Sequence, residues 1–236
     1  MPVFKLTEEL LFPPAHLAEP DGLLAIGGDL SPQRLLLAYS SGLFPWFNEG
    51  DPPLWWCPDP RSVFEPGEMN ISRTLLKTLR RKKFQVTMNR DFPGVIDACA
   101  TVRKAQGEET WITARLTESF LILHKMGFAH SIECWFEQDL VGGLYGVSIG
   151  RCFFGESMFH TVADSSKVAL AHLLRLAEIN KLELVDCQLP NQHLSALGAK
   201  EISREVFLAR LRDGDVVPSP DPAGGMLSFQ DVSARW

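Results

Sequence analysis

The sequence lacks several features that mark common protein classes. It has no run of about 18 apolar residues that could span a bilayer. Its first residues do not join a basic segment to an apolar one, as a secretory signal does. The five cysteines, at positions 57, 99, 134, 152 and 187, form no C-x-x-C pair. An odd number without such pairs argues against a disulfide framework or a zinc ribbon. We therefore expect a cytoplasmic protein.

Patterns typical of metal and cofactor sites are missing as well. The six histidines form no H-x₃-H pair and no H-E-x-x-H motif. The segment GESMFHTVADSSK, residues 155–167, precedes a long predicted helix and has only one glycine, next to a glutamate. A loop that cradles a diphosphate needs several glycines and no such carboxylate, so an acyl-CoA donor is disfavoured. We expect no metal and no cofactor.

Positive charge is scarce overall but locally concentrated. The 236 residues carry 23 Lys and Arg against 29 Asp and Glu, a net charge of −6, which disfavours a protein that coats nucleic acid. Residues 73–83 nevertheless contain a cluster of cations: Arg73, Lys77, Arg80, Arg81, Lys82 and Lys83. The first four have the spacing of one helical face. The cluster indicates either a phosphate-binding helix or a solvated helix with a basic C-terminal end.

Composition changes near residue 62. Residues 1–62 are rich in Pro, Gly and Trp, with one helix at 32–41 that Ser31 caps and Pro32 begins. We expect a small, loop-rich N-terminal domain there, followed by a second domain over residues 63–236 with a loose tail from residue 213.

The second domain has regular helical and strand patterns. Helices are predicted at 71–83 with Ser72 as the N-cap, 92–102, 113–127, 165–180 with Ser165 as the N-cap, 191–198 and 203–214. Strands are predicted at 84–89, 130–136, 140–150, 151–157 and 182–188. The fold class is α+β (mixed α/β). A strand meander, a long helix and another strand are the order of a GNAT-like acyltransferase domain.

The segment LVDCQLPNQH, residues 184–193, gathers polar side chains at the end of a buried strand. Cys187 and His193 raise the hypothesis of a cysteine nucleophile, but a Cys after apolar strand residues is more often a small core residue. Side chains alternate along a strand, so Asp186 and Gln188 are predicted to share the opposite face. They either form a site or cap the following short helix.

Several motifs in this order carry a resemblance to a known family. They are LLAIGGDLSPQRLLLAYSSGLFPWF, LWWCPDPR, TWIT, HSIECW, LVGGLYGVSIGRCFFGESMF, SSKVAL and DCQLPNQHLSALGAKEISREVF. From about residue 10 to residue 210 the chain strongly resembles the leucyl/phenylalanyl-tRNA–protein transferases. The resemblance implies an enzyme that moves Leu or Phe, and Met less well, from its tRNA to the α-amino group of proteins beginning with Arg or Lys. Such proteins then become targets of the bacterial N-end rule degradation pathway.

The resemblance also implies roles for particular residues. Gln188, oriented by Asp186, would meet the attacking amine, and the proton would leave through Gln188 or through the terminal ribose hydroxyl of the tRNA. The other implied sites are an aminoacyl side-chain pocket of Leu144, Phe153, Ser157 and Met158 with Glu156 at its mouth, an adenosine site of Trp46 and Trp111, and the basic helix as the site for tRNA phosphates.

Two other functions remain open on the sequence. One is a GNAT-like enzyme with a different donor or acceptor, such as a peptidoglycan-type aminoacyl transferase. The other is a tRNA-binding module without catalysis. The second alternative predicts that Ala variants of Asp186 and Gln188 keep all function.

Overall fold

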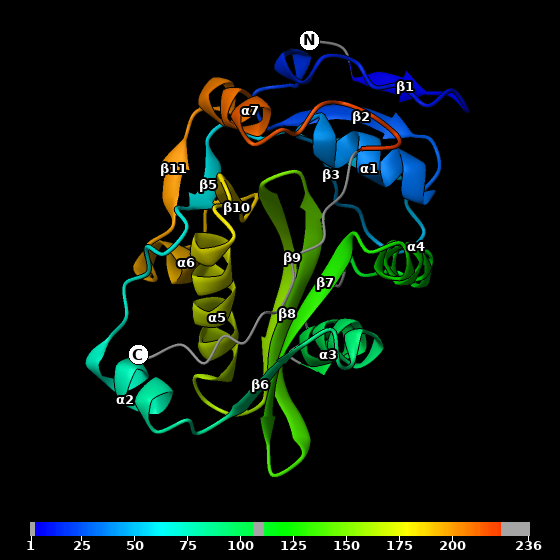
Figure 1. Cartoon of the computed structure of the whole chain (residues 1–236). Helices are drawn as coiled ribbons and strands as arrows, with labels where there is room; N and C mark the ends of the chain where they lie inside the picture. The colour runs from blue at the N-terminus through cyan, green and yellow to red at the C-terminus, as the bar shows by residue number, and fades with distance from the viewer. Residues whose placement is uncertain (1–2, 106–110, 223–236) are drawn as a thin grey trace.

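The structure, a computed structural model, describes residues 3–105 and 111–222 and contains two sheets with helices around them (Figure 1). The smaller sheet comes from the first sixty residues and has the strand order β1-β2-β4-β3. Its elements are β1 (Phe4–Leu6), η1 (Ala15–Leu17), β2 (Leu23–Gly27), α1 (Pro32–Ser40), β3 (Phe44–Pro45) and β4 (Leu54–Trp56).

The larger sheet has seven strands in the order β11-β5-β10-β9-β8-β7-β6. Its strands are β5 (Arg61–Phe64), β6 (Gln85–Met88), β7 (Ala129–Phe136), β8 (Asp139–Ile149), β9 (Cys152–His160), β10 (Leu184–Asp186) and β11 (Lys200–Ile202). The helices are α2 (Arg73–Arg80), α3 (Phe92–Ala105), α4 (Ala114–Lys125), α5 (Ser165–Ile179), α6 (Gln192–Ala196) and α7 (Arg204–Asp213). The predicted mixed α/β class is confirmed. Among the described residues, no helix is both long and apolar enough to cross a membrane.

The predicted meander forms the centre of the large sheet. Each strand from β6 to β9 pairs antiparallel with the next one along the chain. After α5, the chain returns as β10, which pairs parallel with β9. Helix α5 covers one face of this sheet, and α3 and α4 cover the other (Figure 1). A parallel return requires a crossover, which α5 supplies. The first residues after β10 therefore lie beside β9, at the edge of the space under α5.

Helix caps explain where most helices begin. The hydroxyls of Ser31 and Ser72 accept hydrogen bonds from the backbone N–H groups of Arg34 and Leu75, as predicted for two N-caps. The prediction for Ser165 was wrong. Asp164 is the N-cap of α5, with a φ of 72° and no side-chain capping bond, and Ser165 is the first helical residue.

The basic segment is less helical than its spacing predicts. Helix α2 ends at Arg80, Arg81 is its C-cap, and Lys82 has a φ of 49°. A positive φ in a non-glycine residue is incompatible with a continuing right-handed helix. The predicted helix to residue 83 is therefore one turn too long, and the last cations follow it in the turn before β6.

One apolar core joins the parts that the sequence divides at residue 62. Buried side chains of α1 and β4, such as Leu35 and Trp55, belong to the same cluster as Phe120 of α4 and Tyr145 of β8. Strand β5, which spans the division, pairs with β10 and β11 of the large sheet. The division into two domains stays a prediction.

The tail predicted as loose from residue 213 is packed where the structure describes it. Val216 is buried, and Ser219 exchanges hydrogen bonds with Ser40 through its backbone N–H and C=O groups. Residues 223–236 of the predicted tail lie outside the described residues.

Candidate active site

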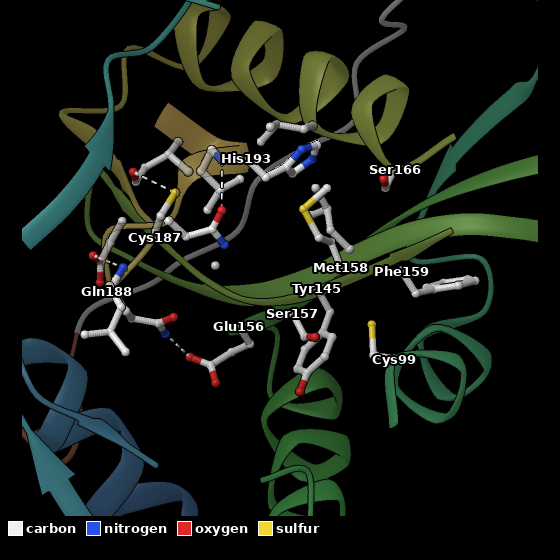
Figure 2. Close-up of a pocket in the computed structure, with 18 of the residues that line it drawn as sticks. Cys99, Tyr145, Glu156, Ser157, Met158, Phe159, Ser166, Cys187, Gln188 and His193 are labelled. Atoms are coloured by element: carbon white, nitrogen blue, oxygen red, sulfur yellow. Dashed lines mark hydrogen bonds between the residues drawn. The ribbon is translucent and has the colours of Figure 1, made fainter. Parts of the chain in front are cut away.

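A cavity of about 700 Å³ opens between the two sheets and α5 (Figure 2). Side chains from β3, α3, β8, β9, α5, α6 and the segment after β10 line it. It holds an apolar wall and, at the end of β10, a group of hydrogen-bonded polar side chains. The polar group contains both residues that the sequence selected, Asp186 and Gln188.

Asp186 is held by an arginine that the sequence analysis missed. The Arg61 guanidinium donates from Nε to Asp186 Oδ1 at 2.8 Å and from Nη2 to Oδ2 at 2.7 Å, with both side chains fully buried. Two parallel N–H···O bonds fix the plane of the carboxylate. Burial opposes the charge of Arg61, but the Asp186 carboxylate outweighs this effect, so the pKa of the guanidinium is raised.

Arg61 also connects Asp186 to three other elements. Its Nη1 donates to the Gly42 carbonyl at 3.2 Å. The guanidinium carbon lies 4.8 Å from the centre of the Phe44 ring and 4.4 Å from that of Phe207. These ring contacts compensate a buried cation in part. A signal in the sequence was available: the arginine of PDPR begins a fully buried strand, where an unpaired charge would be costly.

Gln188 is placed differently from the prediction. Strand β10 ends at Asp186, and Gln188 has a φ of 62°, so strand alternation does not apply to it. Its backbone N–H donates to Asp186 Oδ1 at 2.9 Å, whereas its side-chain Nε2 donates to Glu156 Oε1 at 2.9 Å. Asp186 therefore does not orient the Gln188 side chain by a direct hydrogen bond to its amide. Asp186 acts on the Gln188 backbone instead.

Glu156 is a buried member of this group rather than a residue at the pocket mouth. It is 7% exposed, and its Oε1 accepts a hydrogen bond from Gln188 (Figure 2). The same oxygen accepts another from the Tyr39 hydroxyl, and both bonds measure 2.9 Å. Burial raises the pKa of Glu156 to about 8, and the Asp186 charge adds to this, while the hydrogen bonds and Arg61 act in the opposite direction. Such a carboxyl changes protonation near neutral pH.

Most of the predicted side-chain pocket lines the cavity. Leu144 of β8 and Ser157 and Met158 of β9 are on its wall. Phe153 is not among the residues that line it, and this prediction was wrong. The Phe153 ring is buried against Gly146 of β8, where a Cβ atom would collide with it.

Both predicted adenosine-binding tryptophans also line the cavity. Trp46, which follows β3, is 41% exposed, and its ring packs edge-on against Trp56 at 5.7 Å. The Trp56 indole donates to the Trp46 carbonyl at 2.8 Å, which holds this corner in place. Trp111 is half-buried against the shared core. An exposed indole at a cavity entrance is suited to stack on a planar ring.

The cysteine hypothesis fails on the geometry. Cys187 and His193 both line the cavity, but neither forms a hydrogen bond with the other among the described residues. Burial raises the pKa of the Cys187 thiol above its usual range, and the neighbouring Asp186 charge adds to the rise. A thiol in such surroundings stays protonated and is a poor nucleophile. Among the described residues, no group of His, Cys, Asp and Glu side chains is arranged to hold a metal ion.

The predicted phosphate-binding cations lie outside this cavity, along α2 and the turn after it. All six are exposed, while Leu75 and Leu79 of α2 face the core beneath α5. Lys83 lies over the Phe84 ring at 4.9 Å. This segment therefore presents a basic surface that is separate from the residues lining the cavity.

Comparisons with known proteins agree with the resemblance in the sequence. Residues 63–212 match the family model described as leucyl/phenylalanyl-tRNA protein transferase, and residues 28–59 match the N-terminal domain of the same family. A leucyl/phenylalanyl-tRNA–protein transferase of Syntrophobacter fumaroxidans is 54% identical over 90% of this chain and 91% of its own length. One of Syntrophotalea carbinolica is 51% identical over 95% of this chain and 98% of its own length. The chain therefore belongs to the leucyl/phenylalanyl-tRNA–protein transferase family of aminoacyltransferases.

Proposed function

We propose that the cavity binds the aminoacyl end of Leu-tRNA or Phe-tRNA, and of Met-tRNA less well, and that the chain transfers the aminoacyl group to proteins beginning with Arg or Lys. The observation that carries the proposal is the apolar wall of Leu144 and Met158 next to the polar group around Gln188. The modified proteins would enter N-end rule degradation in the cytoplasm, where aminoacyl-tRNA is made.

The reaction is aminolysis of an ester. The α-amino nitrogen of the acceptor forms a C–N bond to the aminoacyl carbonyl carbon, the ester C–O bond breaks, and the ribose oxygen leaves with a proton. An α-amino group has a pKa of about 7.7–8.0, so a useful fraction is neutral at pH 7. The donor ester is already activated, which is why positioning can supply much of the rate.

Gln188 is suited to position the attacking amine. Its Nε2 is occupied by Glu156, and its side-chain carbonyl oxygen has no hydrogen-bond partner among the described residues. A carbonyl oxygen accepts a hydrogen bond from an amine but is a weak base. We therefore assign Gln188 to orientation of the amine and the terminal ribose hydroxyl to removal of the proton.

Asp186 and Glu156 support Gln188 from two sides. Asp186 accepts from the Gln188 backbone N–H, and Glu156 accepts from its side chain. We assign Asp186 to positioning, because its carboxylate is fully buried behind Gln188 and held by Arg61. Glu156, with a pKa of about 8, can also accept a hydrogen bond from an amino group in its ionised form.

The remaining sites bind the donor. An apolar slot of this kind accepts both Leu and Phe, because pockets discriminate weakly between apolar side chains. Trp46 and Trp111 would hold the terminal adenosine of the tRNA. The cations of α2 and the following turn would contact phosphates of the tRNA body, so that a chain with a net charge of −6 can bind tRNA.

The deciding experiment mixes labelled Leu-tRNA or Phe-tRNA with peptides that differ only in their first residue. Label should pass to peptides beginning with Arg or Lys and not to one beginning with Ala. Transfer to a Lys side chain of an N-acetylated peptide would instead support the peptidoglycan-type alternative. No transfer to any peptide, from donor tRNA that binds, would contradict the proposal.

A single variant, assayed for transfer and for tRNA binding, separates catalysis from binding. Gln188→Ala should lower transfer strongly while the dissociation constant for Phe-tRNA changes little, because Gln188 faces the amine. Equal losses in transfer and in tRNA binding would assign Gln188 to donor binding alone.

A further inference from the structure

The first turn of α5 opens onto the cavity without a side-chain cap. Asp164 is the N-cap residue, but its side chain accepts no capping bond, and the Ser165 hydroxyl donates to the carbonyls of Val141 and Val162. Among the described residues, the backbone N–H of Ser166 has no acceptor. Free N–H groups at the start of a helix, together with the helix dipole, favour an anion.

A buried hydroxyl points to a ligand at the same place. Ser166 is 4% exposed, lines the cavity, and is directed from the end of α5 into it (Figure 2). Its hydroxyl forms no hydrogen bond among the described residues, and its oxygen is not one of the fully enclosed side-chain atoms that lack a partner. The hydroxyl is therefore open to the cavity, where a ligand can reach it. A ligand that accepts hydrogen bonds would satisfy the hydroxyl and the backbone N–H together.

Close approach of α5 to the sheet fixes this position. A side chain at Gly142 of β8 would overlap with Ser165, so glycine lets the start of α5 sit directly on the strand. The Ser165 hydroxyl donates to the Val141 carbonyl at 2.8 Å, which ties the helix to β8. The two donors of Ser166 are therefore held on a rigid support.

Side chains that can donate hydrogen bonds lie at the same end of the cavity. His193 of α6 and His160 at the end of β9 both line it. The pKa of His193 is lowered by burial and then by the charges of Lys167 and His160, so its ring is a neutral N–H donor at neutral pH. The carboxylate at this rim, Asp164, is paired with Lys167 at 3.1 Å, which offsets its repulsion of an anion.

We propose that Ser166, the first turn of α5 and His193 bind the phosphodiester that joins the donor's terminal adenosine to the preceding nucleotide. This proposal rests on the proposed function, because an aminoacyl group in the cavity places that phosphate one nucleoside away from the ester. The acceptor is a poor occupant, since a peptide beginning with Arg or Lys would bring positive charge to the positive end of the α5 helix dipole. Residues 155–167 lack the several glycines that a diphosphate-binding loop needs, but one phosphate group needs only the few donors described here.

The test uses two stable donor analogues, 3′-phenylalanylamido-adenosine with and without a 5′-phosphate. The phosphate should tighten binding to the unaltered protein by about tenfold or more, the effect of one or two charge-assisted hydrogen bonds. Calorimetric titration gives both dissociation constants and their ratio. In Ser166→Ala and in His193→Gln the ratio should fall towards one. His16→Gln, an exposed histidine away from the cavity, should keep the ratio of the unaltered protein.

The phosphate site would be refuted by equal affinity for the two analogues or by no detectable binding of either. It would also be refuted if the ratio of the two dissociation constants stayed unchanged in both variants. The proposed function is judged separately, by transfer from intact Phe-tRNA. Transfer without a phosphate effect would refute this site alone, and absence of transfer would refute the proposed function.

Discussion

Replacement of Arg61 by methionine tests whether the buried ion pair supports both the fold and the site. Arg61→Met removes both bonds to Asp186 and leaves its carboxylate without a counterion in a fully buried position. Removal of one partner from a buried pair costs about 3–5 kcal/mol. A stable domain has about 5–15 kcal/mol in total, so the variant should fold but unfold at a much lower urea concentration. Methionine keeps an apolar stem between Phe44 and Phe207, so packing is largely retained while the charge and its hydrogen bonds to Asp186 and Gly42 are lost.

The control for this variant is an exposed ion pair of the same type. Arg175 pairs with Glu178 on α5, with both side chains about half-exposed. Exposed pairs contribute about 0–1 kcal/mol, so Arg175→Met should change the free energy of unfolding little. Arg61→Met should also lower kcat, because Asp186 would no longer hold the Gln188 backbone rigidly. A loss of less than about 1 kcal/mol, similar to the control, would refute the argument that the pair is a major support.

Three further predictions concern the chemistry and the donor. Cys187→Ala should keep transfer within about twofold, because a thiol with a raised pKa takes no part in it; a large loss would revive the nucleophile. Glu156 is more easily protonated in the folded chain, with a pKa of about 8 against 4.5, so its contribution to stability is present at low pH and is lost as the pH rises towards 8. As the pH rises through that interval, the free energy of unfolding of the unaltered protein, measured in urea, should therefore fall relative to that of Glu156→Gln by up to about 1.4 kcal/mol per pH unit. Parallel pH profiles of the two proteins would contradict this. Exchange of Lys82 and Lys83 for Glu should weaken tRNA binding and reduce its salt dependence by about one unit of slope per lost phosphate contact, and unchanged binding would move the tRNA site elsewhere.

Periodicity and caps predicted the elements whose formation depends on nearby residues. The amphipathic pattern and the Ser31 and Ser72 caps gave α1 and α2, and alternation with tight turns gave the meander of β7, β8 and β9. Strands β5 and β11 were not predicted. Each has three or four residues, and each is a strand only because it pairs with the other and, for β5, with β10. Pairing between segments more than a hundred residues apart leaves no periodic signal in either one.

Asp186 and Gln188 were selected as candidate site residues for a reason that the structure corrects. Strand alternation placed Asp186 and Gln188 on one face, but the strand ends between them and Gln188 turns to a φ of 62°. That conformation costs roughly 1 kcal/mol in a residue with a side chain. Here the hydrogen bond from the Gln188 N–H to Asp186 offsets the cost. The turn sends the Gln188 side chain towards Glu156 on β9, away from the carboxylate that the sequence had paired with it.

The polar group therefore depends on the first sixty residues as much as on the large sheet. Tyr39 on α1 donates to Glu156, and Phe44 on β3 and the Gly42 carbonyl contact Arg61, which in turn holds Asp186. A small shift of α1 or β3 would loosen both supports of Gln188 at once. Because Arg61 itself stands at the first position of β5, the chain passes from one sheet to the other exactly where the ion pair forms. The N-terminal segment is a structural part of the candidate site, and a fragment that begins after it would lack Tyr39, Phe44 and the Gly42 carbonyl, which support Gln188 through Glu156 and Arg61.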